Sequence, residues 1–192
     1  MVRCRRSGYA RKVTVHRLIR AADSFRAADR FSGAAARWLR RAIQGRAAGV
    51  LRGAWLGHPV HPLLVTVPLG AWIGAAALDP WPHQRDAARR LVALGLAVVP
   101  PAVVAGLADF PELTTTQRRV AVLHAATNTV GAGCFVASYR HRARGADRVG
   151  IAWTWLGLLG ISAGGALGGH LSYALGAGVH RWQGGPVTGT GT

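Results

Sequence analysis

The stretch Gly57-His58-Pro59-Val60-His61-Pro62 marks the point where this chain changes character. A basic, arginine-rich segment precedes it, and four long apolar runs follow it. Its two histidines are three residues apart, so they project from the same side if a helix begins there. Its prolines suit a helix start, where missing amide donors cost least. The motif is therefore predicted to open the first of four membrane spans.

The four apolar runs are long enough to cross a bilayer, whose core requires about 20 apolar residues, with a range of about 17–25. They cover residues 59–78, 91–108, 120–139 and 149–169. Paired prolines at 100 and 101 are expected to kink the second run. Buried helices of a soluble protein are the alternative, but four successive uncharged runs favour insertion. The predicted fold is all-α: a polytopic membrane four-helix bundle with a basic amphipathic helical N-terminal extension.

Residues 1–56 form the basic extension. The chain has a formal net charge of +17, and 14 of its 24 Lys and Arg residues lie before residue 53. Apolar residues recur at helical spacing from residue 13 to residue 56, and Gly33, Gly45 and Gly49 are expected to divide this segment into short helices. Basic amphipathic helices often lie flat among headgroups, so we expect contact with anionic lipid. A helical hairpin packed on a partner protein is the alternative, and no motif indicates nucleic-acid binding.

Three regions follow from this pattern. The basic segment covers residues 1–56, the four-span domain covers residues 57–183, and a Gly- and Thr-rich tail, expected to be disordered, covers residues 184–192. The basic N-terminal segment favours a cytoplasmic N-terminus, and four spans return the C-terminus to the same side. The sequence alone indicates no internal repeat.

Several polar residues within the apolar part fall on one side of the predicted bilayer. Ionisable groups in membrane spans are costly and usually face a bundle interior with a partner. An alternating path brings the residues at the same end of each span to a shared depth. We therefore predict one polar cluster, formed by His58, His61, Asp109, His124, Asn128 and His170.

Three chemistries suit this cluster. His58, His61, His124 and His170 could supply the ligands of a b-type haem, with Asp109 or Asn128 fixing a tautomer. The histidines and Asp109 could instead hold zinc or another transition metal. A set that titrates near neutral pH could also bind a quinone headgroup or relay protons. The structural alternative is a hydrogen-bonded clamp that holds no cofactor.

The opposite side of the predicted bilayer carries other polar and aromatic residues. Asp79 follows the first span and is expected to pair with Arg85 or Arg89 in a loop, a contact worth little. Trp72 and Tyr139 are expected to belong to an interfacial aromatic belt. Gly160, Gly164 and Gly168 repeat at four-residue intervals in the fourth span, which favours close helix packing and permits a homo-oligomer. These residues are interpreted as structural.

Four blocks of this sequence, taken in order, resemble the bacterial membrane protein family of domain of unknown function 2231. They are Leu56-Gly57-His58-Pro59-Val60-His61-Pro62, Val67-Pro68-Leu69-Gly70-Ala71-Trp72, His124-Ala125-Ala126-Thr127-Asn128-Thr129-Val130 and Gly168-Gly169-His170-Leu171-Ser172-Tyr173. The resemblance implies a four-span protein of the bacterial inner membrane. Some relatives carry a Rieske iron–sulfur domain, whose Cys-x-His and Cys-x-x-His motifs this chain lacks. That association implies a redox setting by analogy.

The function predicted from the sequence is a redox-associated membrane subunit whose histidines bind haem or a metal ion, with a redox partner or a second copy of the chain as candidate partners. No nucleophile elbow, paired catalytic carboxylates or phosphate-binding glycine loop indicates a hydrolase. We therefore expect a subunit rather than an enzyme on its own.

Overall fold

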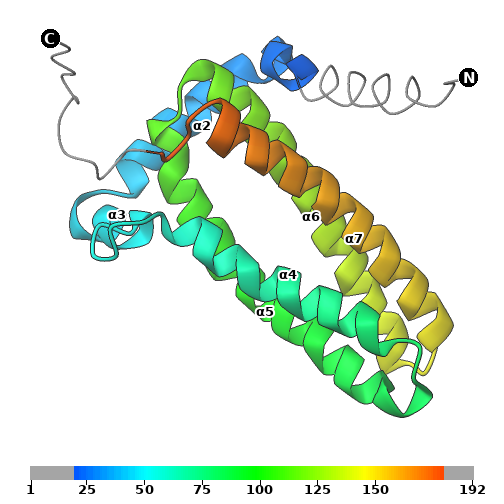
Figure 1. Ribbon diagram of the computed structural model, residues 1–192. Helices are drawn as coiled ribbons and strands as arrows, with labels where there is room; N and C mark the ends of the chain where they lie inside the picture. The colour runs from blue at the N-terminus through cyan, green and yellow to red at the C-terminus, as the bar shows by residue number, and fades with distance from the viewer. Residues whose placement is uncertain (1–19, 180–192) are drawn as a thin grey trace, which may run out of the picture.

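The computed structural model describes residues 20–179, and within that range the chain is helical and contains no strand (Figure 1). The all-α prediction is therefore confirmed. The predicted tail at residues 184–192 and the first nineteen residues lie outside the described residues.

Four long helices form two hairpins. Helix α4 (Val60–Leu78) packs along α5 (Arg85–Asp109), and α6 (Thr115–Ala143) packs along α7 (Asp147–Gly169), as Figure 1 shows. All four are long and apolar enough to cross a membrane. The second, third and fourth helices extend beyond the predicted apolar runs, because their charged ends also wind as helix.

The long helices keep much of their apolar surface on the outside of the bundle. Only 22–28% of the residues in their most apolar windows are buried. Leu63, Val130 and Leu159 are 56%, 67% and 68% exposed. Large apolar patches on a protein surface mark contact with a membrane or another protein. The outer surface of the four helices therefore suits contact with lipid or with another protein.

The ends of the helices follow local sequence signals. Pro59 is the N-cap of α4, and Pro62 lies in its first turn, where an amide donor is not needed. Thr114 and Gln117 form a capping box that begins α6. Helix α5 continues as one helix through Pro100 and Pro101.

The core between the hairpins is aromatic. The rings of Trp72 and Phe135 stack with centroids 3.9 Å apart. Trp72 is 2% exposed, and its indole Nε1 donates to the carbonyl of Val92 at 3.3 Å. The prediction that Trp72 belongs to an interfacial belt is therefore wrong. A glycine opposite each ring, Gly95 or Gly157, leaves the space that the ring fills.

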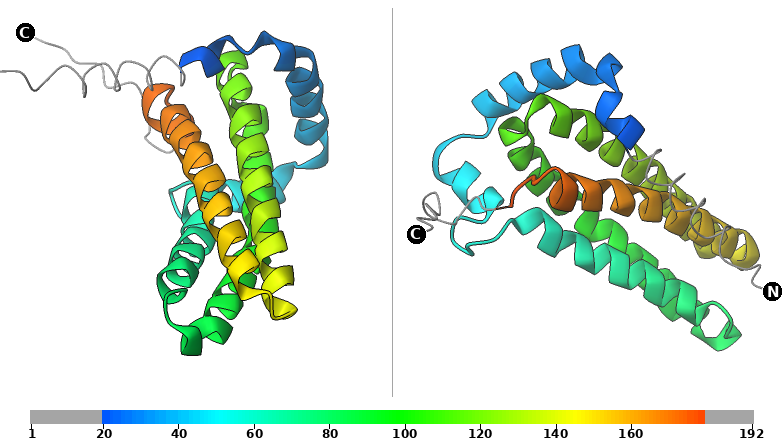
Figure 2. Two further views of the ribbon diagram at one scale, coloured as in Figure 1. Left: turned by 90° about the vertical axis from the view of Figure 1, so that its right-hand side faces the viewer. Right: turned by 45° about the horizontal axis from the view of Figure 1, so that its top comes forward.

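The described part of the basic segment, residues 20–56, folds over one end of the bundle (Figure 2). It contains the short 3₁₀ helices η1 (Ala22–Ser24) and η2 (Arg26–Ala28), followed by α2 (Asp29–Ala42) and α3 (Gly45–Arg52). Of the three glycines expected to divide the segment, only Gly45 lies at a helix boundary; Gly33 and Gly49 lie inside helices.

Arginines fasten this segment to the turn between α5 and α6. Arg40 donates to the carbonyl of Pro111 at 2.6 Å, and Arg52 donates to the carbonyl of Ala108 at 2.9 Å. Arg52 also pairs with Glu112 at 3.2 Å. The carbonyl of Ala108 near the end of α5 and the carbonyl of Pro111 in the following turn thus gain donors from a segment distant in the sequence.

Candidate functional site

His61 lies in the first turn of α4 and is oriented by the neighbouring helix of its own hairpin. Its Nδ1 lies 2.8 Å from the carbonyl oxygen of Ala102 in α5. A carbonyl oxygen only accepts hydrogen bonds, so the hydrogen bond places the ring proton on Nδ1. In the neutral ring the lone pair is then on Nε2.

His124 in α6 repeats this arrangement in the second hairpin. Its Nδ1 lies 2.8 Å from the carbonyl oxygen of Gly164 in α7. The same argument assigns the proton to Nδ1 and the lone pair to Nε2. A histidine that binds a metal commonly donates its other ring N–H to a carbonyl in this way.

The two imidazoles lie close to each other between the hairpins, in an edge-to-face arrangement. The ring centroids of His61 and His124 are 6.3 Å apart, and the ring planes are inclined by 79°. Both side chains are half-buried. Of the predicted cluster, these are the two histidines that the structure brings together.

Asn128 covers one face of the His124 ring. Its Nδ2 donates to the carbonyl of His124 at 2.8 Å and lies 3.2 Å from Nε2 and 3.3 Å from Nδ1. Nearly equal distances to both nitrogens place the amide over the ring, because an in-plane position would collide with Cε1 between them. The lone pair of Nε2, which lies in the ring plane, therefore points elsewhere.

His170 is bound to a residue outside the predicted cluster. His170 begins the π-helical turn η5 (His170–Ala174), and its Nε2 lies 2.9 Å from a carboxylate oxygen of Asp23. His58 is exposed in the turn before α4. Asp109 is half-buried at the end of α5. Within residues 20–179, no three His, Cys, Asp or Glu side chains are placed to share a metal ion.

The surroundings of His170 and His58 follow from the basic segment and from the turn before α4. The basic segment covers the end of the bundle and brings Asp23 to His170, which is 147 residues away in the sequence. The backbone of His58 closes the turn against Gly53, whose left-handed φ of 87° ends α3. A side chain at Gly53 would collide with the His58 carbonyl, so this histidine serves the turn through its backbone.

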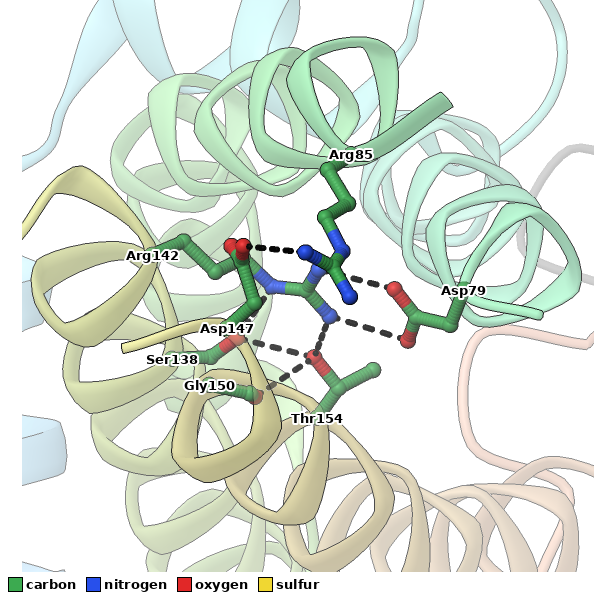
Figure 3. A network of polar contacts seen from close by, with 7 residues as sticks. All are labelled: Asp79, Arg85, Ser138, Arg142, Asp147, Gly150 and Thr154. Carbon is green, nitrogen blue, oxygen red and sulfur yellow. Dashed lines mark hydrogen bonds and ion pairs between the residues drawn. The ribbon is translucent and has the colours of Figure 1, made fainter. Parts of the chain in front are cut away.

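A second polar site lies at the opposite end of the hairpins and was not predicted. Arg142 in α6 and Asp79 at the end of α4 form a two-pronged ion pair, with Nη1–Oδ1 and Nη2–Oδ2 distances of 2.7 and 2.9 Å (Figure 3). Their side chains are 0% and 5% exposed. The shorter contact departs from hydrogen-bond angles, so it acts as an ion pair.

Two hydroxyl groups complete the surroundings of the guanidinium. Arg142 donates from Nε to Ser138 at 3.1 Å and from Nη2 to Thr154 at 3.0 Å. The hydroxyl groups of Ser138 and Thr154 are 2.8 Å apart (Figure 3). The sequence held a signal for this site: Ser138 is four residues before Arg142, on the same helix face.

The predicted loop pairings of Asp79 are therefore wrong. Arg85 pairs with Asp147 at 3.3 Å, and Arg89 binds Asp86 at 2.6 Å. Asp79 instead reaches α6, because the end of α4 lies beside the last turns of that helix.

No family model, curated protein or solved structure matches this chain. The resemblance to the family of domain of unknown function 2231 thus stays a prediction.

His61 and His124 would be the residues that hold a metal-containing cofactor. The 6.3 Å between their ring centroids would leave room for nitrogen–metal bonds of about 2 Å. The set does not fit a tetrahedral zinc site, which requires three or four protein ligands. A b-type haem would need only two histidines from the protein, and it would supply one-electron chemistry.

Proposed function

We propose that this protein is an integral membrane protein of the bacterial inner membrane that holds a b-type haem between His61 and His124. One observation carries the proposal: the two imidazoles lie 6.3 Å apart between the hairpins, and each donates Nδ1–H to a backbone carbonyl. Both Nε2 atoms keep their lone pairs for a metal ion. The exposed apolar surface of the long helices supports insertion.

The residues of this chain would orient the ligands. The carbonyls of Ala102 and Gly164 fix the tautomer of each ring, and the amide of Asn128 restrains the His124 ring from one side. A haem with two histidine ligands supplies one-electron oxidation and reduction. This chemistry suits a redox-associated subunit. Such a role agrees with the redox setting implied by the family resemblance.

Anionic lipid is the proposed partner of the basic segment. Helix α2 buries Ser32, Ala36 and Leu39 against the bundle and exposes Phe31 and Trp38. Exposed arginines lie beside these two aromatic side chains. Aromatic and basic residues on one exposed face are typical of helices that lie in the headgroup region.

The absorption spectrum of detergent-purified protein tests haem binding. We expect a Soret band that is lost in His61→Ala and in His124→Ala, because each variant removes one iron ligand. His170→Ala is the matched control, since His170 binds Asp23 instead, and it should keep the band. Colourless, metal-free protein that remains folded would refute the proposal and favour the clamp, in which the imidazoles only hydrogen-bond to backbone.

A further inference from the structure

Three side-chain pairs join α4 to α6 between the two hairpins. In every pair the residue numbers differ by 63. Successive pairs are 11 and then 7 residues apart in both helices, which corresponds to about three and about two helical turns. The pairs are His61 with His124, Trp72 with Phe135, and Asp79 with Arg142.

The second helix of each hairpin repeats the same supporting contacts. The carbonyls that accept from the two histidines belong to Ala102 and Gly164, whose numbers differ by 62. The glycines that face the stacked aromatic rings differ by 62 as well. The glycines beside the imidazoles, Gly106 and Gly168, show the same difference. Helices α5 and α7 are therefore equivalent, as α4 and α6 are.

The two hairpins run in the same direction. Helix α4 and helix α6 both begin at the histidine end and finish at the Asp79–Arg142 end (Figure 1). Residues that meet on a two-fold axis are equivalent residues of the two units. The three pairs therefore lie along a pseudo-two-fold axis parallel to the bundle, as in parallel repeats of membrane proteins.

The repeat is faint in the sequence, which explains why none was predicted. Few equivalent positions carry identical residues. In the first helices they are His61/His124, Thr66/Thr129, Val67/Val130 and Gly70/Gly133, and in the second helices Leu94/Leu156, Gly95/Gly157, Leu96/Leu158 and Gly106/Gly168. Outward-facing positions accept many different apolar residues. The three side-chain pairs between α4 and α6 are therefore the clearest sign of the repeat.

We propose that the bundle is built from two equivalent hairpins and that each hairpin supplies one half of the imidazole site. Gly106 positions the ring of His61, and Gly168 positions the ring of His124. The proposal deepens the proposed function and rests on it for the identity of the ligand. Each half-site consists of a histidine on the first helix, an accepting carbonyl on the second helix, and a glycine one turn beyond that carbonyl.

The two glycines position the rings because the absence of a Cβ leaves room for each imidazole. A Cβ at Gly106 would lie 3.0 Å from His61 Nδ1, and a Cβ at Gly168 would lie 3.0 Å from His124 Nδ1. Such contacts are tighter than ordinary van der Waals packing, so a methyl group would displace the ring. Displacement of the ring weakens the 2.8 Å hydrogen bond that sets its tautomer.

Ring nitrogen NMR spectra of cofactor-free, detergent-purified protein test the half-sites without any haem. Both His61 and His124 should show the neutral tautomer with the proton on Nδ1. Gly106→Ala should shift the His61 signals alone, and Gly168→Ala should shift the His124 signals alone, by a similar amount. Gly133→Ala and Gly165→Ala are matched controls, because no neighbouring atom lies within 4 Å of an added Cβ. Assignments follow from His61→Gln and His124→Gln.

The outcomes separate the two proposals. An Nε2–H tautomer in either wild-type ring overturns the half-site equivalence, and so does a glycine variant that leaves its histidine unchanged. If a glycine variant fails to fold, the tautomers of the two wild-type rings still test the half-site equivalence. In haem-loaded protein, both glycine variants should weaken haem binding about tenfold or more. Protein that never binds haem but shows these ring signals refutes the proposed haem binding and leaves the equivalence of the two half-sites standing.

Discussion

At the scale of single residues, the decisive feature besides the histidines is the buried charge of Arg142. Its side chain has no exposed surface, and Asp79, Ser138 and Thr154 supply its partners. Removing charges from water is costly, so a buried pair contributes little net stability while either partner left alone is strongly destabilising. Because positions 79 and 142 are equivalent, two copies of one hairpin would meet there with like charges. The opposite charges favour the pairing of the two unlike hairpins.

Asp79→Asn should lower the free energy of unfolding by about 3–5 kcal/mol, because the guanidinium of Arg142 stays buried without its counter-charge. Unfolding in detergent, followed by loss of helical circular dichroism, measures the change. The matched control is Asp86→Asn, whose carboxylate pairs with Arg89 and Arg90 at the surface, where solvent screens the pair, so the substitution should change the free energy of unfolding far less. Equal effects of the two substitutions would contradict the role given to the buried pair.

A second variant separates charge burial from packing. Asp79→Leu combined with Arg142→Met should recover much of the stability lost in Asp79→Asn, because apolar side chains of similar volume often replace a buried ion pair without loss. The same unfolding measurement applies. A double variant less stable than Asp79→Asn would contradict this expectation. It would show that the hydrogen bonds from Arg142 to the two hydroxyl groups stabilise the bundle by more than the burial of the ion pair costs.

At the scale of elements, the docking of the basic segment depends on Asp29 at the start of α2. Arg119 in α6 contacts both carboxylate oxygens of Asp29 at 2.7 Å. The hydrogen bonds from Arg119 hold the pKa of Asp29 below its usual value. Arg119 also donates to the carbonyl of Asp23 at 3.0 Å, so one side chain of α6 holds two points of the basic segment.

The docking of α2 should weaken in acid. Folding lowers the pKa of Asp29. The contribution of the Asp29 carboxylate to the docking of α2 is therefore complete above the usual aspartate pKa of about 4, and it is lost as the pH falls through the lowered pKa. Hydrogen exchange of the α2 amides, expressed as protection factors relative to the intrinsic rate at each pH, should show lower protection at pH 3 than at pH 7. Asp29→Asn should show the lower protection already at pH 7. Equal protection in this variant and the wild type would contradict the docking role.

The long helices could be predicted because each depends on its own sequence. Apolar runs, Pro59 before α4, and the Thr114–Gln117 capping box are local signals that tertiary contacts extend but do not override. The site could be predicted only in part. The pairing of His61 with His124 follows from the alternating path, whereas the Asp23–His170 contact depends on how a distant segment folds back.

At the scale of the whole molecule, four helices able to cross a membrane carry a basic segment at one end. The histidine pair lies near that end, and the buried ion pair lies at the other. The orientation decides which side of the membrane the imidazole site is close to. With the basic segment in the cytoplasm, the site lies near the cytoplasmic side.

Reporter fusions test this orientation. A fluorescent protein fused to either end of the chain should be active in the cytoplasm, because an even number of spans returns the chain to the same side. Alkaline phosphatase at the same positions should be inactive, whereas phosphatase inserted between α4 and α5 should be active. Phosphatase activity at the ends would show the opposite orientation.

The central claim is that the two hairpins share one cofactor between equivalent histidines. The most direct measurement is the haem content of the purified full-length chain, read from the reduced-minus-oxidised spectrum and its pyridine haemochrome. One b-type haem per chain is predicted in the wild type, with a spectrum typical of two histidine ligands, and none in His61→Ala or His124→Ala. Folded wild-type protein without haem, or variants that retain full haem content, would contradict the account.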